Sequence, residues 1–135
     1  MAVPSQKLTE IVKGAEAVFE DPMAKYPELS QSKLEVDAPR SYEVAMRDGV
    51  ILSTTAIAPK PAGKYPVILV RTPYDQKSQL PQGGSWAAKG YIFIAQDVRG
   101  TGASKGEWDP FIHERKDGYD TIDWISKQAW CDGNI

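Results

Sequence analysis

A chain of 135 residues is one domain or part of one, and it is long enough to bury a sizeable core. Its formal net charge of −2, without a basic stripe, argues against a nucleic-acid partner. The single cysteine, Cys131, excludes an internal disulfide and a cysteine-based metal cluster, and we expect it to be a small buried hydrophobe. The first 20 residues carry scattered charges and no apolar segment. They therefore predict neither a signal peptide nor a membrane span, and we expect a cytoplasmic protein.

Residues 1–40 are predicted to form a part of their own, an N-terminal helix followed by an extended connector. Apolar side chains between Leu8 and Phe19 recur at helical spacing, which predicts an amphipathic helix over residues 5–20. Asp21-Pro22 ends this helix. Residues 23–40 are rich in proline and polar residues and lack a period, so they predict the connector. The second part then comprises residues 41–135.

Residues 41–95 contain the signals of a mixed sheet. Two β-prone runs, Tyr42–Met46 and Val50–Ala58, flank Asp48-Gly49, and Asp-Gly supplies the positive φ of a tight hairpin turn. Two apolar strands follow, Val67–Val70 and Tyr91–Ala95, separated by enough residues for a helix. This pattern predicts a parallel βαβ unit. Because the strand that begins at Val67 is continuously apolar, we expect both of its faces to be covered.

Two helices and a further strand are predicted around and after this unit. A short helix fits residues 85–89, and a longer one fits residues 113–128. The positions of the longer helix predicted to face the core are Ile122, Ile125 and Ala129. The positions predicted to face solvent are Asp117, Asp120 and Asp123. Ile135 is predicted to begin another strand, and a hairpin that leads into a parallel sheet is typical of the start of an α/β-hydrolase fold.

Four sequence motifs occur in order and at fitting spacings. They are Met46–Val50 (MRDGV), Val70–Asp75 (VRTPYD), Gln96–Glu107 (QDVRGTGASKGE) and Asp117–Ile125 (DGYDTIDWI), closing on Trp130–Gly133 (WCDG). Together they resemble the opening third of the Xaa-Pro dipeptidyl-peptidase and cocaine-esterase-like family of serine hydrolases. The resemblance covers about residues 41–135. It implies the N-terminal portion of an α/β-hydrolase domain that cleaves ester, amide or peptide bonds with a Ser-acid-His triad and without a cofactor or metal.

The resemblance also implies that the catalytic triad lies outside this chain. In the family the serine elbow follows the strand that Ile135 begins, so we expect no nucleophile, triad acid or triad histidine among the 135 residues. The chain alone is then expected to be inactive and to need the missing part of the domain, in cis or in trans. The expected strand order leaves the strand Val67–Arg71 as an open apolar edge, which predicts an aggregation or assembly site.

Tyr74 is the candidate catalytic residue. It follows the first parallel strand, where the α/β-hydrolase fold places one donor of the oxyanion hole. The resemblance implies that the phenolic O–H of Tyr74 is this donor, in place of a main-chain N–H. Pro73 restricts the residue before it to extended geometry and thereby directs the loop. The alternative is a tyrosine packed at the strand end, with its O–H on a main-chain carbonyl.

Ser104 and His113 match parts of a catalytic pattern but lie in the wrong context. The segment Gly102–Gly106 satisfies G-x-S-x-G, yet a nucleophile elbow needs a strand directly before the serine and a helix directly after it. Here the strand ends near Asp97 and no helix can begin before Pro110, so we expect Ser104 to make local main-chain hydrogen bonds. His113 precedes the expected elbow, in the wrong order for the fold, and is predicted to be a partly exposed residue at the start of a helix.

Several other residues have structural and functional interpretations side by side. Asp97 and Arg99 are expected to form an ion pair or a hydrogen-bonded brace beneath the active-site loops, with direct substrate contact as the alternative. The tryptophans expected to fill the core, or alternatively to line an acyl pocket, are Trp86, Trp108 and Trp124.

Two other functional classes remain to be tested. The segment Gly100–Gly106 resembles a dinucleotide-binding loop, but its spacing is G-x-G-x-x-x-G and no helix opens on its last glycine. The other class is a non-catalytic product, either a truncated hydrolase or a fragment that complements another chain.

Overall fold

The computed structural model describes residues 25–135, so the helix predicted over residues 5–20 lies outside the described part. Contacts set Ser32–Ile135 apart as one unit, and this unit contains all the described strands. Residues 25–31 belong to the other unit and contain a turn in which the Leu29 N–H donates to the Tyr26 carbonyl (3.0 Å).

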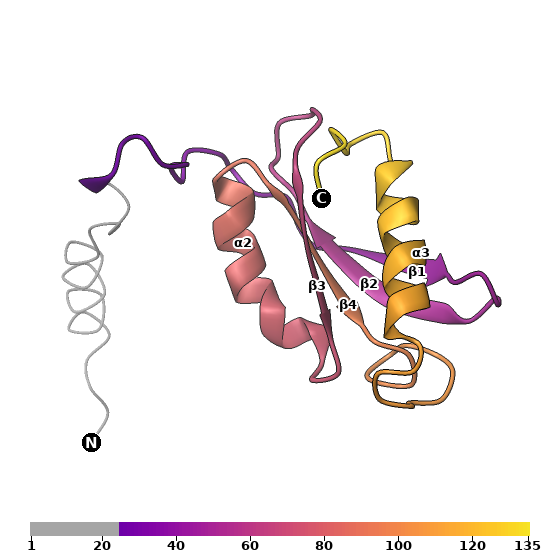
Figure 1. The fold of residues 1–135 in the computed structure, drawn as a ribbon. Coiled ribbons are helices and arrows are strands. Elements are labelled where there is room, and N and C mark those ends of the chain that lie inside the picture. The colour runs from indigo at the N-terminus through magenta and orange to yellow at the C-terminus, as the bar shows by residue number, and fades with distance from the viewer. Residues whose placement is uncertain (1–24) are drawn as a thin grey trace, which may run out of the picture. The chain divides into compact units, whose positions relative to one another are not determined.

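The unit Ser32–Ile135 is built on a mixed sheet of four strands (Figure 1). The strands are β1 (Arg40–Ala45), β2 (Ile51–Ile57), β3 (Val67–Thr72) and β4 (Ile92–Asp97). Their order in the sheet is β1-β2-β4-β3. The pairs β1–β2 and β2–β4 are antiparallel, whereas β3 and β4 are parallel, with Thr72 opposite Asp97. The predicted hairpin and βαβ unit are therefore confirmed, and the hairpin joins the parallel strands in one sheet.

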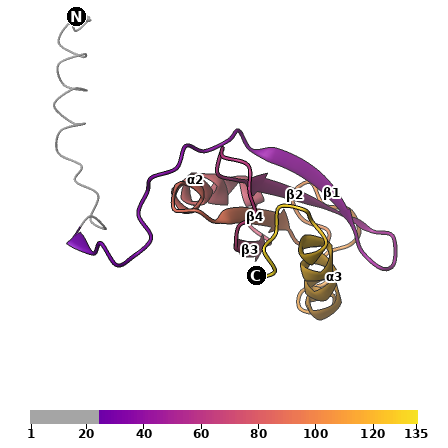
Figure 2. The same ribbon diagram turned by 90° about the horizontal axis from the view of Figure 1, so that it is seen from above.

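Helices cover both faces of this sheet (Figure 2). They are α2 (Leu80–Ala88), which a 3₁₀ turn η2 (Gln76–Gln79) precedes, and α3 (Glu114–Ser126). The prediction for residues 85–89 covered only the end of α2, because the pair Gly83-Gly84 is unfavourable within a helix. Gly83 is needed there for packing, since a Cβ at this position would lie 2.6 Å from Phe93 Cδ1 and 2.9 Å from Ile57 Cδ1.

β4 is the strand most completely enclosed by the rest of the unit. All six of its residues are buried, and alternate side chains point to opposite faces of the sheet. Phe93 lies against α2, whereas Ile94 packs with Ile125 of α3. The prediction that the strand beginning at Val67, which is β3, is covered on both faces is met only in part. Residues 68–70 of β3 are only half-buried, because β3 is the edge strand of the described sheet.

The buried face of α3 differs from the predicted one. Its buried residues are Asp117, Thr121 and Ile125, spaced four residues apart on one face. Ile122 is 46% exposed and Ala129 is also exposed, so the predicted inner face was wrong except for Ile125. The physical reason is that β4 and the loop after it supply polar partners for this face: Thr121 Oγ1 donates to Gln96 Oε1 (3.0 Å) and Asp117 pairs with Arg99.

The last residues of the chain run beside the start of β3. An isolated parallel bridge joins Tyr65 to Cys131, and the Val67 N–H donates to the Asn134 carbonyl (2.9 Å). Cys131 is buried in the main core cluster, as predicted. No strand is assigned at Ile135 itself, but the segment before it adds to the β3 edge in the parallel sense. None of the described helices is long and apolar enough to cross a membrane.

The two neighbouring glycines of α2 provide a matched test of this packing. Gly83→Ala is expected to destabilise the chain by about 1–3 kcal/mol, because the new methyl group would overpack Phe93 and Ile57. Gly84→Ala is expected to stabilise it by about 0.5–1 kcal/mol, since a Cβ there meets nothing within 4 Å and alanine favours the helix. Urea unfolding of both variants measures the difference, and equal effects would contradict the packing of α2 on the sheet.

Candidate active-site rim

The loops that follow β3 and β4 meet at one edge of the sheet. Because the two strands are parallel, their carboxyl ends lie side by side, and the Val98 N–H donates to the Thr72 carbonyl (3.1 Å). We call this edge the carboxyl rim, made of residues 73–76 and 98–106. Ligands of open α/β sheets bind beyond such an edge. The rim is therefore the first place to look for a functional site.

Tyr74 lies on this rim directly after β3. Its main-chain N–H donates to Thr72 Oγ1 (3.0 Å), while the residue as a whole is 82% exposed. Within residues 25–135 its phenolic O–H has no hydrogen-bond partner and its ring stacks on no other ring. The alternative of a packed tyrosine bonded to a main-chain carbonyl is thus not observed. The phenol is free to serve as a donor.

The residue after Tyr74 has a strained backbone. Asp75 has φ 70° and ψ 111°, a combination that residues other than glycine rarely adopt. Local bonds hold the turn: Asp75 Oδ1 accepts from the Lys77 N–H (2.9 Å), and the Asp75 carbonyl accepts from Ser78 Oγ (2.8 Å). Strain of this kind persists only where surrounding contacts impose it, and it is often found at functional sites.

Asp97 ends β4 and links the two loops of the rim. Its carboxylate is 1% exposed and accepts three hydrogen bonds. Oδ1 accepts from the Gln76 N–H (2.7 Å), and Oδ2 accepts from Gln76 Nε2 (3.2 Å) and the Ala103 N–H (3.1 Å). Gln76 Nε2 also donates to Ser53 Oγ of β2 (2.8 Å). The expected brace beneath the loops is present, but Asp97 forms it without Arg99.

Arg99 instead clamps the β1–β2 turn to α3. The guanidinium group is 8% exposed and donates to both Asp117 (2.7 and 2.9 Å) and Asp48 (2.8 and 3.1 Å). The hydrogen bonds from Arg99, helped by the Val50 N–H, lower the pKa of Asp48. The same pairs, that with Asp117 first, raise the pKa of Arg99. Asp117 was predicted to face solvent, and only the fold shows that it has a cation to pair with.

A second arginine joins the same turn to α3 at the surface. Arg47 donates from its main-chain N–H (2.8 Å) and from Nε and Nη2 (3.0 and 2.7 Å) to the Asp120 carboxylate. The hydrogen bonds from Arg47 lower the pKa of Asp120. The motifs MRDGV and DGYDTIDWI are thus joined directly by the Arg47–Asp120 pair and indirectly by Arg99, which pairs with both Asp48 and Asp117.

Ser104 is a structural hydroxyl group in this fold. It donates to the Asp97 carbonyl (2.6 Å) and accepts from the Ser53 N–H (2.8 Å). No helix follows it before α3, which begins at Glu114. The expectation for Ser104 is confirmed. The missing helix also leaves the glycines of this loop without the helix N-terminus that a dinucleotide phosphate requires.

His113, Trp108 and Trp124 lie outside the hydrogen-bond network of the carboxyl rim. His113 is half-buried at the N-cap of α3, as predicted. Trp124 packs edge-on against Tyr42 (5.3 Å between ring centroids) and belongs to the core, also as predicted. The core prediction is wrong for Trp108, which is 55% exposed in the loop between β4 and α3. Among residues 25–135 no cluster of histidine, cysteine or carboxylate side chains is arranged to hold a metal ion.

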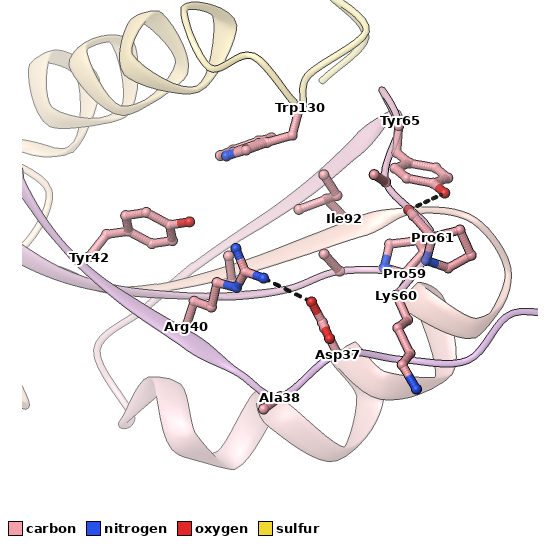
Figure 3. Close-up of a pocket in the computed structure, with 14 residues that line it drawn as sticks. Asp37, Ala38, Arg40, Tyr42, Pro59, Lys60, Pro61, Tyr65, Ile92 and Trp130 are labelled. Atoms are coloured by element: carbon pink, nitrogen blue, oxygen red, sulfur yellow. Dashed lines mark hydrogen bonds and ion pairs between the residues drawn. The ribbon is translucent and has the colours of Figure 1, made fainter.

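A cavity of about 250 Å³ lies at the opposite end of the sheet, near Ile92 at the start of β4 (Figure 3). Its aromatic lining residues are Tyr42, Tyr65 and Trp130. Two charged side chains at its margin already form ion pairs, Arg40 with Asp37 (2.9 Å) and Lys60 with Glu35 (2.8 Å). The cavity is smaller than ordinary small-molecule pockets of roughly 300–1,000 Å³. The carboxyl rim is therefore the better candidate site.

Comparison with known proteins agrees with this geometry. The family model of the X-Pro dipeptidyl-peptidases, the S15 family, matches residues 48–135, which is more than half of the chain. The chain belongs to the S15 family. The cocaine esterase of Rhodococcus sp. (strain MB1 Bresler) is 43% identical over 98 residues, which cover 68% of this chain and 17% of the esterase.

Solved structures extend the S15 assignment to the fold. An α-amino acid ester hydrolase is 28% identical, with a TM-score of 0.59 over 86% of this chain and 23% of its own. An aminopeptidase from a marine sediment archaeon (Thaumarchaeota archaeon) is 26% identical, with a TM-score of 0.63 over 87% of this chain and 23% of its own. The predicted α/β-hydrolase fold is confirmed as a portion of such structures. The chain spans about a fifth of the length of these relatives.

The sequence does not predict the role of Gln76, a buried residue that donates hydrogen bonds to both Asp97 and Ser53. Its position two residues after Tyr74 was the only available signal, since glutamine in a polar loop ordinarily faces solvent. The structure also brings Thr72 against the Tyr74 N–H, a role that sequence reasoning did not assign to it.

The two arginine clamps predict how stability depends on pH. The folded-state pKa values of Asp48 and Asp120 are lowered, so both carboxylates contribute stability above their unfolded value of about 4 and lose it as the pH falls through the folded values. We expect the free energy of unfolding of the native chain to fall between about pH 7 and about pH 3, and to fall less for Asp48→Asn and Asp120→Asn. Urea unfolding at both pH values is the measurement. Glu43→Gln, which removes an exposed carboxylate of β1 and leaves both clamps intact, is the control.

Proposed function

We propose that this chain supplies the oxyanion-hole side of a serine hydrolase that cleaves ester or amide acyl bonds. The observation that carries the proposal is Tyr74, whose phenol projects freely from the carboxyl rim directly after the parallel strand β3. Membership of the S15 family and likeness to an esterase and an ester hydrolase support acyl transfer as the reaction. The substrate is then a small ester, amide or peptide.

The chemistry assigned to Tyr74 is electrostatic. When a nucleophile adds to an acyl carbon, negative charge builds on the carbonyl oxygen, and a fixed donor aimed at that oxygen stabilises the transition state more than the ground state. A phenolic O–H is a suitable donor because it is neutral near pH 7 and reaches beyond the main chain. The absence of an internal partner for this group, within the part of the chain that the structure describes, leaves it available to substrate.

The nucleophile and its base are proposed to lie on other polypeptide. Ser104 is engaged with main-chain groups at both of its hydrogen-bonding positions, and His113 is at the start of α3 rather than in a Ser–His pair. The chain spans only about a fifth of its relatives, so the rest of such a domain, in cis or in trans, would complete the site.

The edge of β3 is where that polypeptide would join. The Pro66 and Thr72 carbonyls accept from Ile92 and Val98, on the side of β4, whereas the Val67 N–H donates to the Asn134 carbonyl on the other side. Successive residues of a strand present their main-chain groups to opposite sides, so Leu69 and Arg71 present theirs to the free edge. A parallel strand laid there would satisfy these groups. The same observation favours a second candidate function, a non-catalytic fragment that complements another hydrolase chain through this edge.

Removing the Tyr74 phenol tests the oxyanion role. In a chimera that carries the matching 98-residue segment of this chain in the Rhodococcus cocaine esterase, Tyr74→Phe is expected to lower kcat by about 100- to 1000-fold, or roughly 2.7–4 kcal/mol, with a much smaller change in KM. Steady-state ester hydrolysis measures both constants. Tyr119→Phe, which removes an exposed phenol from α3, should leave kcat within about twofold. An unchanged kcat in Tyr74→Phe would remove the assignment.

The chain by itself is expected to be inactive. It should neither hydrolyse an activated ester, such as a p-nitrophenyl acyl ester, above the rate of a Ser104→Ala control nor react with a serine-directed fluorophosphonate. Mass spectrometry after incubation detects the adduct. Labelling of Ser104 would contradict the structural role of this hydroxyl, and NAD binding in a parallel titration would favour the nucleotide-binding alternative.

A further inference from the structure

We propose that Asp97 is a positioning residue for Tyr74, which it controls through the main chain of Gln76; this inference rests on the proposed function of Tyr74. Asp97 touches neither the phenol nor, in this arrangement, a substrate. Its role is to hold the loop from which the phenol projects. Asp97 does so from β4, a strand whose six residues are all buried.

The direction in which the exposed side chain of Tyr74 projects depends on its main chain. The backbone fixes the direction of the Cα–Cβ bond. Because the ring has no hydrogen bond or ring contact among the described residues, this direction is the main constraint on where the phenol lies. That backbone is held on both sides. Before the ring, the Tyr74 N–H is bonded to Thr72 Oγ1 (3.0 Å), and after it, the Gln76 N–H is bonded to Asp97 Oδ1 (2.7 Å).

The strain at Asp75 indicates that the hydrogen bond from the Gln76 N–H to Asp97 is needed to keep the loop in place. A residue at φ 70° and ψ 111° relaxes toward an ordinary conformation unless its neighbours prevent it. The bonds that Asp75 makes itself, to Lys77 and Ser78, close the local turn but do not attach it to the sheet. Asp97 attaches the main chain of the turn to β4 by accepting from the Gln76 N–H, directly after the strained residue, whereas Ser53 of β2 holds only the Gln76 side chain.

The carboxylate of Asp97 bonds only to the two loops of the rim among the described residues. It is buried, and Arg99, the nearest cation in sequence, is occupied by Asp117 and Asp48. Its acceptor oxygens are instead satisfied by N–H donors from both loops of the rim, two from Gln76 and one from Ala103. A buried carboxylate with three such donors is held firmly, since each N–H satisfies one of its acceptor positions.

The loop after β4 is shaped around the same carboxylate. Gly102 has φ 52°, and a Cβ at this position would lie 2.3 Å from Asp97 Oδ2. Any side chain there would displace Asp97 or the loop. The close approach lets the Ala103 N–H reach Oδ2, so one carboxylate sets the distance between the Tyr74 loop and the glycine loop.

The first test uses the 135-residue chain itself and needs no activity. Asp97→Asn keeps one acceptor oxygen but places an NH₂ group against N–H donors. By NMR, amide hydrogen exchange at Gln76 is expected to accelerate about tenfold or more, the factor that corresponds to loss of one charge-assisted hydrogen bond, and the backbone of Tyr74 to gain fast motion. Asp117→Asn, which alters an equally buried carboxylate bonded to Arg99, should leave both signals as they are. Equal protection of Gln76 in Asp97→Asn and the native chain would overturn the proposal.

The second test asks whether Asp97 acts on catalysis through Tyr74. In the cocaine-esterase chimera, Asp97→Asn is expected to lower kcat at least tenfold with little change in KM, but to have no more than a twofold effect when Tyr74→Phe is already present. If Tyr74→Phe alone leaves kcat unchanged, the proposed function fails while the NMR test still decides the positioning role. If Tyr74→Phe lowers kcat but Asp97→Asn lowers it equally in both backgrounds, the positioning role fails and the proposed function stands. Should Asp97→Asn not fold in the chimera, Gln76→Leu enters the same cycle with a smaller expected effect, because it removes the Nε2 bonds to Asp97 and Ser53 but keeps the main-chain N–H bond to Asp97.

Discussion

The parallel pairing of β3 with β4 is the constraint on which the rest of this structure depends. It sets Thr72 opposite Asp97, so that the two side chains stand at the same end of the sheet when both strands finish. Each side chain then supports the Tyr74 loop. Thr72 accepts a hydrogen bond from the Tyr74 N–H, and Asp97 accepts one from the Gln76 N–H. A shift in strand register by one residue would turn one of these side chains to the opposite face.

Two separate networks of polar side chains lie around the rim. On the α2 face of the sheet, Asp97, Gln76 and Ser53 connect the loops to β4 and β2. On the α3 side, Arg99 joins Asp117 to Asp48 and fixes the β1–β2 turn. Alternation along a strand would place Asp97 and Arg99 on the same face, but β4 ends at Asp97 and the chain turns there, so these two charged residues serve different systems. Charges this close in sequence pair with distant partners because the fold supplies better geometry than the local chain.

The open edge of β3 gives the S15-family chain its second distinctive property. Among the described residues β3 is an edge strand, a position that favours further strand pairing, and the Val67–Asn134 bond continues the parallel Tyr65–Cys131 bridge along this edge. The proposed division of roles follows from this arrangement. The described unit would orient the donor of the oxyanion hole, and a strand added at the edge would bring the attacking group to the same rim.

Local patterns in the sequence determined the hairpin, the two parallel strands, the loop character of Ser104 and the family, because turn residues, apolar runs and ordered motifs act over short distances. The same patterns misplaced the inner face of α3 and the start of α2, since the burial of Asp117 depends on Arg99 and the tolerance of Gly83 depends on Phe93. Only the tertiary structure decided which carboxylate meets which donor. Hydrogen bonds that join residues 18 to 73 positions apart, such as Arg99 to Asp117 and Arg47 to Asp120, leave no trace in a local pattern.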